Sequence, residues 1–535
     1  MAGSIDVQDV AVPLPDGTRL ATDLFLPADG ERHPVFLLRT PYSRASLRAV
    51  HDPVELARAG WAVVVQDVRG RVASEGRFDA LRQEGPDGAA VVEWCAAQPW
   101  STGRVAMAGA SYNGWVQWTA ARHRPRGLAA IAPLVSSPYA GRSWFREGGA
   151  FKIGAWANWA MAMATAGNGG TRAAERRAVK DVQRLLELVA HPPDVERIAS
   201  HFPAFAEWYA ADVADWAETE GPGPLASRVQ VPVYNLTGWY DIFVEGAIDA
   251  YEELAHRSRR EAVRRSQRLV VGPWSHMADL IQVVGTVDFG AEANWLQRGI
   301  PAEQLRFLRD AAEGREVRGG VDVFVMGRNR WLELDSWPPP ATETAFHLES
   351  GSSANGSGGD GRLLDAPPER AGFDRWRHDP ADPVPTTGGR HLLWQPAPPG
   401  PADQREVERR RDVLVYTSEP LARELTAIGR VRAELHVAST APRADFAVKL
   451  VDVHPDGRAI NVVDSISRAD LVPGRTTRVS VDVGRTAMTF LRGHRLRIEV
   501  ASSNHPHLDL LEAADQTLHW GGRTPSRLLL PLHGG

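Results

Sequence analysis

The sequence predicts an α/β fold followed by an all-β region, and three observations lead to this prediction. First, short apolar runs that fit buried strands alternate with helix-like segments up to about residue 318. Second, residues 138–225 interrupt this alternation with helical spacing and many aromatic side chains. Third, from residue 319 onward apolar and polar side chains alternate and turn residues are dense. We therefore expect a covered sheet, an inserted helical cap and a C-terminal β-sandwich or jelly roll.

The first part of the chain begins with a predicted hairpin over residues 5–26. Its turn, Pro15-Asp16-Gly17-Thr18, has the residue types of a tight reversal. Val35–Leu38 and Trp61–Val65 are wholly apolar, as expected of strands that are covered on both faces. A helix is predicted over about Glu84–Gln98. Strands that alternate with helices in this way indicate a parallel sheet.

The sheet resumes after the aromatic insertion. Val231–Leu236 and Leu269–Val271 are predicted strands, and Ala302–Ala312 is a predicted closing helix. We therefore expect a sheet domain from residues 1–137 and 226–318, a cap from 138–225 and a jelly roll from 319–535. Within the last part, the glycine- and serine-rich segment 351–361 is expected to be a floppy surface loop.

The stretch Val105–Trp115 joins a predicted buried strand to a predicted helix through a serine. Gly109 and Ala110 precede Ser111, and small residues suit the strained turn that exposes a nucleophilic serine above a sheet. The usual pattern is G-x-S-x-G, whereas here the second glycine falls one place later, at Gly114. A serine beside glycines is more often an ordinary turn, so the interpretation depends on the rest of the chain.

Two later residues complete a candidate catalytic triad. A serine needs a base, and that base needs a carboxylate to hold its tautomer. In an α/β-hydrolase sheet the order along the chain is serine, acid, histidine, each beyond a strand. Asp241 follows the strand that ends at Leu236, and His276 follows Leu269–Val271. The order and the positions therefore predict Ser111 as nucleophile, His276 as general base and Asp241 as its partner.

Composition excludes several other classes of function. The formal net charge of -5 gives no reason to expect nucleic acid or an anionic membrane as a partner. No signal peptide or membrane-spanning run is recognisable, so a cytoplasmic location is expected. Cys95 is the single cysteine and the histidines are dispersed, with His505-Pro506-His507 too isolated to count. No cofactor and no metal site are expected, and the oligomeric state, including a homodimer, is left open.

Several motifs resemble the bacterial cocaine esterase branch of the X-Pro dipeptidyl-peptidase-like serine hydrolases. They cover nearly the whole chain and occur in the same order: Arg39-Thr40-Pro41-Tyr42, Gln66-Asp67-Val68-Arg69-Gly70, Ser74-Glu75-Gly76, Gly109-Ala110-Ser111-Tyr112-Asn113-Gly114, Gly238-Trp239-Tyr240-Asp241, Val271-Gly272-Pro273-Trp274-Ser275-His276, Asp382-Pro383-Val384-Pro385-Thr386 and Lys449-Leu450-Val451-Asp452-Val453. The resemblance implies an α/β-hydrolase domain, a helical cap and a C-terminal jelly roll. It also implies an oxyanion hole formed by the Tyr42 hydroxyl and the backbone N–H of Tyr112.

The resemblance also bears on the substrate. In related α-amino-acid ester hydrolases, two acidic residues follow the triad aspartate by two and three places, and here Phe243 and Val244 stand there. An apolar wall would leave an ammonium group unpaired. The implied substrate pocket is apolar, and its expected residues are Trp144, Trp159, Phe243, Leu392 and Leu393. We therefore expect hydrolysis of small-molecule carboxylic esters through an acyl-enzyme, with an apolar or aryl acyl group.

Three alternatives stay open at this point. The chain could be an X-Pro dipeptidyl-peptidase or amidase, or an α-amino-acid ester hydrolase, because Glu147 or Glu245 could bind an amine. It could also be a glycan-binding protein in which the β region carries the function. The intact triad, and a β region without an obvious calcium or aromatic-platform signature, argue against that third alternative.

Overall fold

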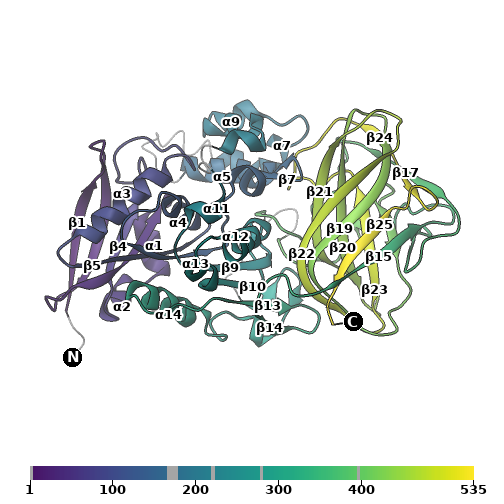
Figure 1. Cartoon of the computed structure of the whole chain (residues 1–535). Coiled ribbons are helices and arrows are strands. Elements are labelled where there is room, and N and C mark those ends of the chain that lie inside the picture. Colours follow the sequence, from purple (N-terminus) through teal and green to yellow (C-terminus); the bar gives the residue numbers. More distant parts are fainter. Residues whose placement is uncertain (1–3, 166–178, 218–222, 277–280, 394–397, 535) are drawn as a thin grey trace.

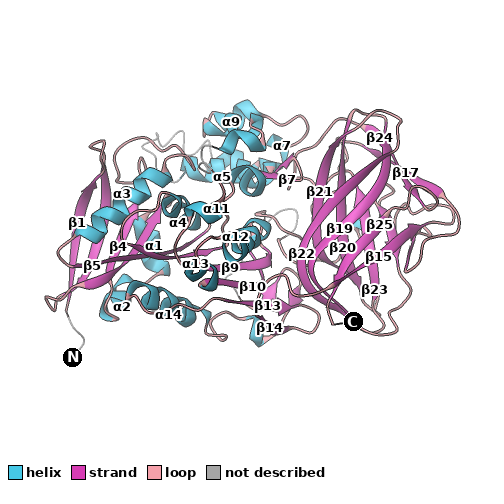
Figure 2. Cartoon of the chain, viewed as in Figure 1, coloured by secondary structure: helices cyan, strands magenta, loops and turns pink. Residues whose placement is uncertain are grey.

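The structure is a computed structural model that describes residues 4–165, 179–217, 223–276, 281–393 and 398–534. It divides into a mixed α/β part, a helical cap above it and a β-rich part beside both (Figure 1). Figure 2 shows that helices are concentrated in the first two parts, whereas strands fill the third. This is the predicted fold class, and the fold-class prediction is confirmed.

The α/β part is built on one sheet whose central strands are parallel and covered. Its order is β1-β2-β4-β3-β5-β6-β9-β10-β13-β14. Pairing is parallel from β4 through β13 and antiparallel at both ends. The strands are β1 (Ile5–Pro13), β2 (Arg19–Pro27), β3 (His33–Thr40), β4 (Ala62–Asp67), β5 (Ser101–Ala110), β6 (Leu128–Leu134), β9 (Val233–Tyr240), β10 (Gln267–Ser275), β13 (Gly320–Val325) and β14 (Arg330–Leu334).

Helices cover both faces of this sheet, as its wholly apolar strands require. In Figure 1, α3 and α4 lie above the strands and α2 and α14 lie below them. Every residue of α4 is buried, and its neighbour α3 approaches closely because Gly88 carries no side chain. The helices of this part are α1 (Arg44–Val50), α2 (Pro53–Arg58), α3 (Glu84–Ala97), α4 (Tyr112–Arg122), α11 (Leu225–Arg228), α12 (Val244–Arg257), α13 (Glu261–Arg265) and α14 (Ile300–Ala312).

The cap has its own aromatic core, which explains the many tryptophans in that stretch. Phe145, Trp156 and Trp208 pack with ring centroids between 5.0 and 5.9 Å apart. These rings bury the apolar faces of helices that are too short to be stable alone. The cap elements are η1 (Ala140–Phe145), β7 (Arg146–Glu147), β8 (Ala150–Phe151), α5 (Ile153–Thr165), α7 (Leu185–Leu188), α8 (Val195–Ala199), α9 (Ala204–Ala210) and η2 (Val213–Trp216).

The β-rich part is one folded-over array of strands with an apolar interior, in which every pair is antiparallel except β16 with β18. Its order is β17-β24-β19-β25-β15-β16-β18-β23-β20-β21, with β22 on β19. The strands are β15 (Thr342–Glu349), β16 (Arg362–Leu364), β17 (Gly372–His378), β18 (Leu414–Thr417), β19 (Leu425–Ser439), β20 (Arg443–Val453), β21 (Ala459–Asp470), β22 (Thr477–Phe490), β23 (Arg495–Ala501), β24 (Ala514–Trp520) and β25 (Arg527–Leu532). The remaining short elements of the chain are β11 (Val283–Val284), β12 (Val287–Asp288), η3 (Ala291–Ala293) and η4 (Val407–Arg409).

Two sequence expectations differ from the structure. The expected boundary at residue 319 falls before β13 and β14, which extend the α/β sheet by pairing with β10. Alternation alone cannot show which sheet a strand joins. The expected floppy loop at 351–361 is held by Asp360, whose carboxylate accepts hydrogen bonds from the backbone N–H groups of Gly351, Ser352 and Ser353.

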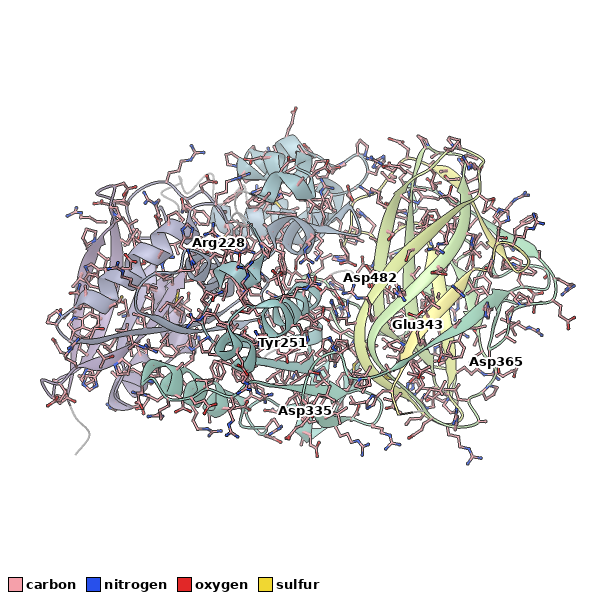
Figure 3. The ribbon with its side chains drawn as sticks, in the orientation of Figure 1. Arg228, Tyr251, Asp335, Glu343, Asp365 and Asp482 are labelled. Carbon is pink, nitrogen blue, oxygen red and sulfur yellow. The ribbon has the colours of Figure 1, made fainter. Side chains whose placement is uncertain are left out.

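Buried ion pairs join the β-rich part to the α/β part. Arg485 of β22 is 2% exposed and pairs with three carboxylates of α12, those of Glu245, Asp249 and Glu252. Asp482 of the same strand lies on the side that faces the α/β part (Figure 3) and pairs with Arg430, which also lies 3.6 Å from Asp249 of α12. These contacts fix the position of the β-rich part beside the strand ends that carry the candidate site. No helix within the described ranges is long and apolar enough to cross a membrane.

Candidate active site

Ser111 lies on a strained turn between β5 and α4. Its backbone has φ 58° and ψ -120°, a conformation that is unfavourable for a residue with a side chain. A Cβ on Gly109 would lie 2.7 Å from the Cβ of Asn113, and a Cβ on Gly114 would lie 2.4 Å from the Cβ of Ser136. Gly114 lies one place later than the second glycine of the usual G-x-S-x-G pattern. It is needed there because α4 passes close to the segment that follows β6.

The three predicted triad residues meet beyond the carboxyl ends of β5, β9 and β10. The Nε2 atom of His276 lies 2.9 Å from Ser111 Oγ, and its Nδ1 atom lies 2.7 Å from Asp241 Oδ1. Because an ionised carboxylate only accepts, Nδ1–H donates to Asp241 and Nε2 is free to accept the serine proton. The arrangement can therefore remove a proton from Ser111 and hold the resulting imidazolium.

Asp241 is completely buried and is fixed from its other side by Thr237. The Thr237 hydroxyl donates to Asp241 Oδ2 at 2.7 Å, while Oδ1 faces His276. Both carboxylate oxygens therefore have a donor, which a buried charge requires. The sequence analysis missed Thr237, although its place in β9, four residues before Asp241, could have drawn attention to it.

The two predicted oxyanion donors lie beside Ser111. The Tyr42 hydroxyl interacts with Ser111 and accepts a hydrogen bond at 3.1 Å from the indole N–H of Trp159. Burial raises the pKa of Tyr42 above its usual value, so the phenol stays a proton donor. Tyr112 begins α4, so its backbone N–H has no partner within the helix. Together they can bind a negatively charged oxygen.

The phenol group of Tyr112 has partners other than Ser111. Its hydroxyl donates to Glu84 at 3.1 Å and accepts from the backbone N–H of Leu81 at 2.8 Å. Glu84 is completely buried, and burial raises the pKa of its carboxyl to about 7. This polar anchor fixes the first turn of α4, and with it the residue that follows the serine.

The structure places four of the five predicted pocket residues in one aromatic cluster next to His276. Phe243 packs on Trp144 with centroids 4.3 Å apart and lies edge-on to His276 at 5.2 Å. Trp159 stacks on Tyr112 at 5.9 Å, and Leu392 of the β-rich part packs against the same cluster. Leu393 differs, because it is buried against Gly154 of the cap.

Neither candidate carboxylate for an amine site is unpaired. Glu245 accepts hydrogen bonds from Arg390 at 2.8 Å and from Arg485 at 2.6 Å. Glu147 lies 3.8 Å from Lys152 and 3.5 Å from His507. The side chains two and three places after Asp241, Phe243 and Val244, are apolar and buried. Within the described residues, these positions give an ammonium group no free carboxylate.

One group of possible metal ligands escaped the sequence analysis, which expected no metal site. Asp452, His454 and His494 offer ligand atoms within 4.8 Å of one another, brought together from two turns of the β-rich part. Both Nδ1 atoms already have partners: His494 Nδ1 lies 2.9 Å from Asp452, and Arg458 donates to His454 Nδ1 at 3.4 Å. If a metal were bound to Nε2 of His454, the ring proton would be on Nδ1. That N–H group would then face the N–H groups of the Arg458 guanidinium, so two donors would oppose each other. The group fits a hydrogen-bonded network better than a metal site.

Comparisons with known proteins agree with this fold and site. Residues 16–278 match the model of the X-Pro dipeptidyl-peptidase (S15) family, and residues 316–523 match that of the X-Pro dipeptidyl-peptidase C-terminal non-catalytic domain. The cocaine esterase of Rhodococcus sp. (strain MB1 Bresler) is 34% identical, over 98% of this chain and 98% of its own.

Solved structures share the fold. An aminopeptidase from a marine-sediment Thaumarchaeota archaeon has a TM-score of 0.78 at 24% identity, over 99% of this chain and 97% of its own. An α-amino acid ester hydrolase has a TM-score of 0.77 at 22% identity, with the same coverage. The chain is therefore a hydrolase with an S15-type catalytic domain. More particularly, it belongs to the family of cocaine-esterase-like serine hydrolases.

Proposed function

We propose that this protein hydrolyses carboxylic esters with an apolar or aryl acyl group through a covalent acyl-enzyme. The observation that carries the proposal is the continuous hydrogen-bonded chain from Asp241 through His276 to Ser111, with the Tyr42 hydroxyl beside the nucleophile. A serine, a base and an oxyanion donor in reach of one carbonyl carbon are what acyl transfer requires.

In the first half of the proposed reaction, Ser111 Oγ attacks the ester carbonyl and gives its proton to His276 Nε2. The tetrahedral oxyanion is bound by the Tyr42 hydroxyl and the Tyr112 N–H. The imidazolium is held by Asp241 and then protonates the leaving alcohol as the ester C–O bond breaks. In the second half, water takes the place of the alcohol. His276 Nε2 takes its proton as the water oxygen attacks the acyl carbon. The imidazolium then returns the proton to Ser111 Oγ as the bond between the acyl carbon and Oγ breaks, and the carboxylic acid leaves.

The acyl preference follows from the wall of the site. Phe243, Trp144 and Leu392 are apolar side chains next to His276. The alternatives, an X-Pro dipeptidyl-peptidase or amidase and an α-amino-acid ester hydrolase, bind a positively charged amine. Such an amine would be left without a counter-charge beside Phe243 and Val244, because Glu147 and Glu245 are already paired.

A matched substrate panel tests the proposal. Initial rates are measured on 4-nitrophenyl acetate, butyrate and benzoate, on phenylglycine methyl ester and on Gly-Pro-4-nitroanilide. We expect turnover of the plain esters and little turnover of the two amine-bearing substrates. The Ser111→Ala variant should lose about 10⁴-fold or more in kcat on every active substrate. Equal rates for the wild type and Ser111→Ala would refute the triad, and a preference for the amine-bearing substrates would refute the acyl pocket.

A further inference from the structure

Lys152 is a buried cation at the junction of the cap and the α/β part. It lies between β8 and α5 and is 3% exposed. Its Nζ atom donates to the carbonyl oxygen of Ser143 at 2.8 Å and to that of Ile242 at 3.1 Å. A buried ammonium group is costly unless it has partners of this kind. The side chain therefore ties the cap to one particular backbone carbonyl of the α/β part.

That carbonyl belongs to the residue directly after Asp241. Asp241 is completely buried, with Thr237 and His276 on its two oxygens. Asp241 and the Lys152 ammonium also attract each other electrostatically. Lys152 is therefore a nearby cation with two effects on Asp241. It holds the loop that carries Asp241, and it lowers the free-energy cost of burying the negative charge of that side chain.

We infer that Lys152 is a positioning residue for the triad, which orients Asp241 through the Ile242 carbonyl. The inference rests on the proposed function. Loss of Lys152 would loosen the contact between Asp241 and His276, which holds the imidazolium in the transition state.

Other charged groups also act on Lys152. Glu147 of β7 is the nearest carboxylate, at 3.8 Å from Nζ, and Glu245 of α12 and Arg390 of the β-rich part act on it from further away. Burial lowers the pKa of Lys152, and the carboxylates of Glu147 and Asp241 oppose that shift. Glu147 is in turn paired with His507, so replacement of Lys152 leaves Glu147 with one partner.

The three lysines of the chain supply matched variants. Lys152→Met removes the charge and the donor but keeps an unbranched side chain. Lys449→Met removes a buried lysine that instead contacts Gln404 at 2.9 Å in the β-rich part, and Lys180→Met removes an exposed one. Glu147→Gln/Lys152→Met removes both partners of the pair and protects against misfolding of the single variant.

The experiment measures kcat and KM of each variant on the ester that the wild type hydrolyses fastest. For Lys152→Met and the double variant we expect about a ten- to hundredfold loss in kcat with little change in KM, because a misplaced Asp241 no longer holds the imidazolium in the transition state. Lys180→Met and Lys449→Met should leave kcat within about twofold of the wild type.

Two outcomes would overturn the inference. One is a kcat for Lys152→Met equal to that of the controls. The other is a loss that lies in KM alone, since Lys152 would then shape the pocket and not the triad. Ser111→Ala is measured in parallel: if the wild type has no Ser111-dependent turnover, the proposed function itself fails, whereas Ser111-dependent turnover with an unchanged kcat for Lys152→Met removes the Lys152 inference alone.

Discussion

At the scale of single residues, Trp159 has a role that its pocket position alone does not suggest. Its indole N–H donates to the Tyr42 oxygen, which leaves the hydroxyl proton of Tyr42 available for another acceptor. An oxyanion donor works only if it is oriented before charge develops. The same ring stacks on Tyr112, so Trp159 contacts both residues of the proposed oxyanion hole.

Trp159→Phe keeps an aromatic ring but removes this donor. We expect kcat on the best ester to fall about tenfold with little change in KM, because the loss acts on the transition state. Tyr42→Phe should cost more, about 10²–10³ in kcat. The double variant Tyr42→Phe/Trp159→Phe should be no slower than Tyr42→Phe, and a fully additive loss would contradict the coupling.

Glu84 predicts a pH-dependent stability. Its carboxyl has a folded-state pKa of about 7 against an ordinary value of 4.5, because burial penalises the charged form. The folded state therefore binds more protons than the unfolded state between these values, and stability falls as pH rises from about 4.5 to 7. The shift corresponds to at most about 3 kcal/mol.

Glu84→Gln should remove most of this dependence while keeping an acceptor for the Tyr112 hydroxyl. Urea unfolding at pH 5 and pH 8 measures it. The exposed Glu93 of the same helix is the control, and Glu93→Gln should leave the slope with pH as it is in the wild type. A Glu84→Gln slope equal to that of the wild type would contradict the assignment.

At the scale of elements, the serine turn depends on close packing of α4 against the segment after β6. A Cβ at Gly114 would overlap Ser136, whose own Cβ is 2.4 Å from that point. We expect Gly114→Ala to destabilise the protein by about 1–3 kcal/mol and to lower kcat as Ser111 shifts. Thermal unfolding and ester kinetics measure the two effects. Gly358→Ala is the control, since no atom lies within 4 Å of its added Cβ.

At the scale of the whole molecule, the β-rich part is a structural wall of the site. Arg390 donates to the Trp239 carbonyl at 3.0 Å, and the following residues bring Leu392 to the aromatic cluster. Arg485 holds α12 through three carboxylates, and Phe243 immediately precedes that helix. The position of the proposed acyl pocket therefore depends on contacts between the β-rich part and the α/β part.

Arg485→Met should leave several carboxylates of α12 without their main partner. We expect a loss of about 2–4 kcal/mol in stability, and a rise in KM for the benzoate ester that exceeds the change in kcat. Limited proteolysis and the ester kinetics check both parts. Arg478→Met changes an exposed arginine of the same strand and should behave as the wild type.

The sequence by itself determined the fold class, the position of the serine turn and the order of Ser111, Asp241 and His276, because these depend on local patterns. Strand ends and turns depend on amino acids that are neighbours in the sequence, and parallel strands bring their carboxyl ends to one edge of the sheet.

The tertiary structure decided what depends on distant partners. It assigned β13 and β14 to the first sheet, fixed the 351–361 loop through Asp360, and paired Glu147 and Glu245. It also put Lys152 on the carbonyl after Asp241, ninety residues along the chain. Such contacts leave no period or spacing in the sequence, since they arise only when separate elements pack together.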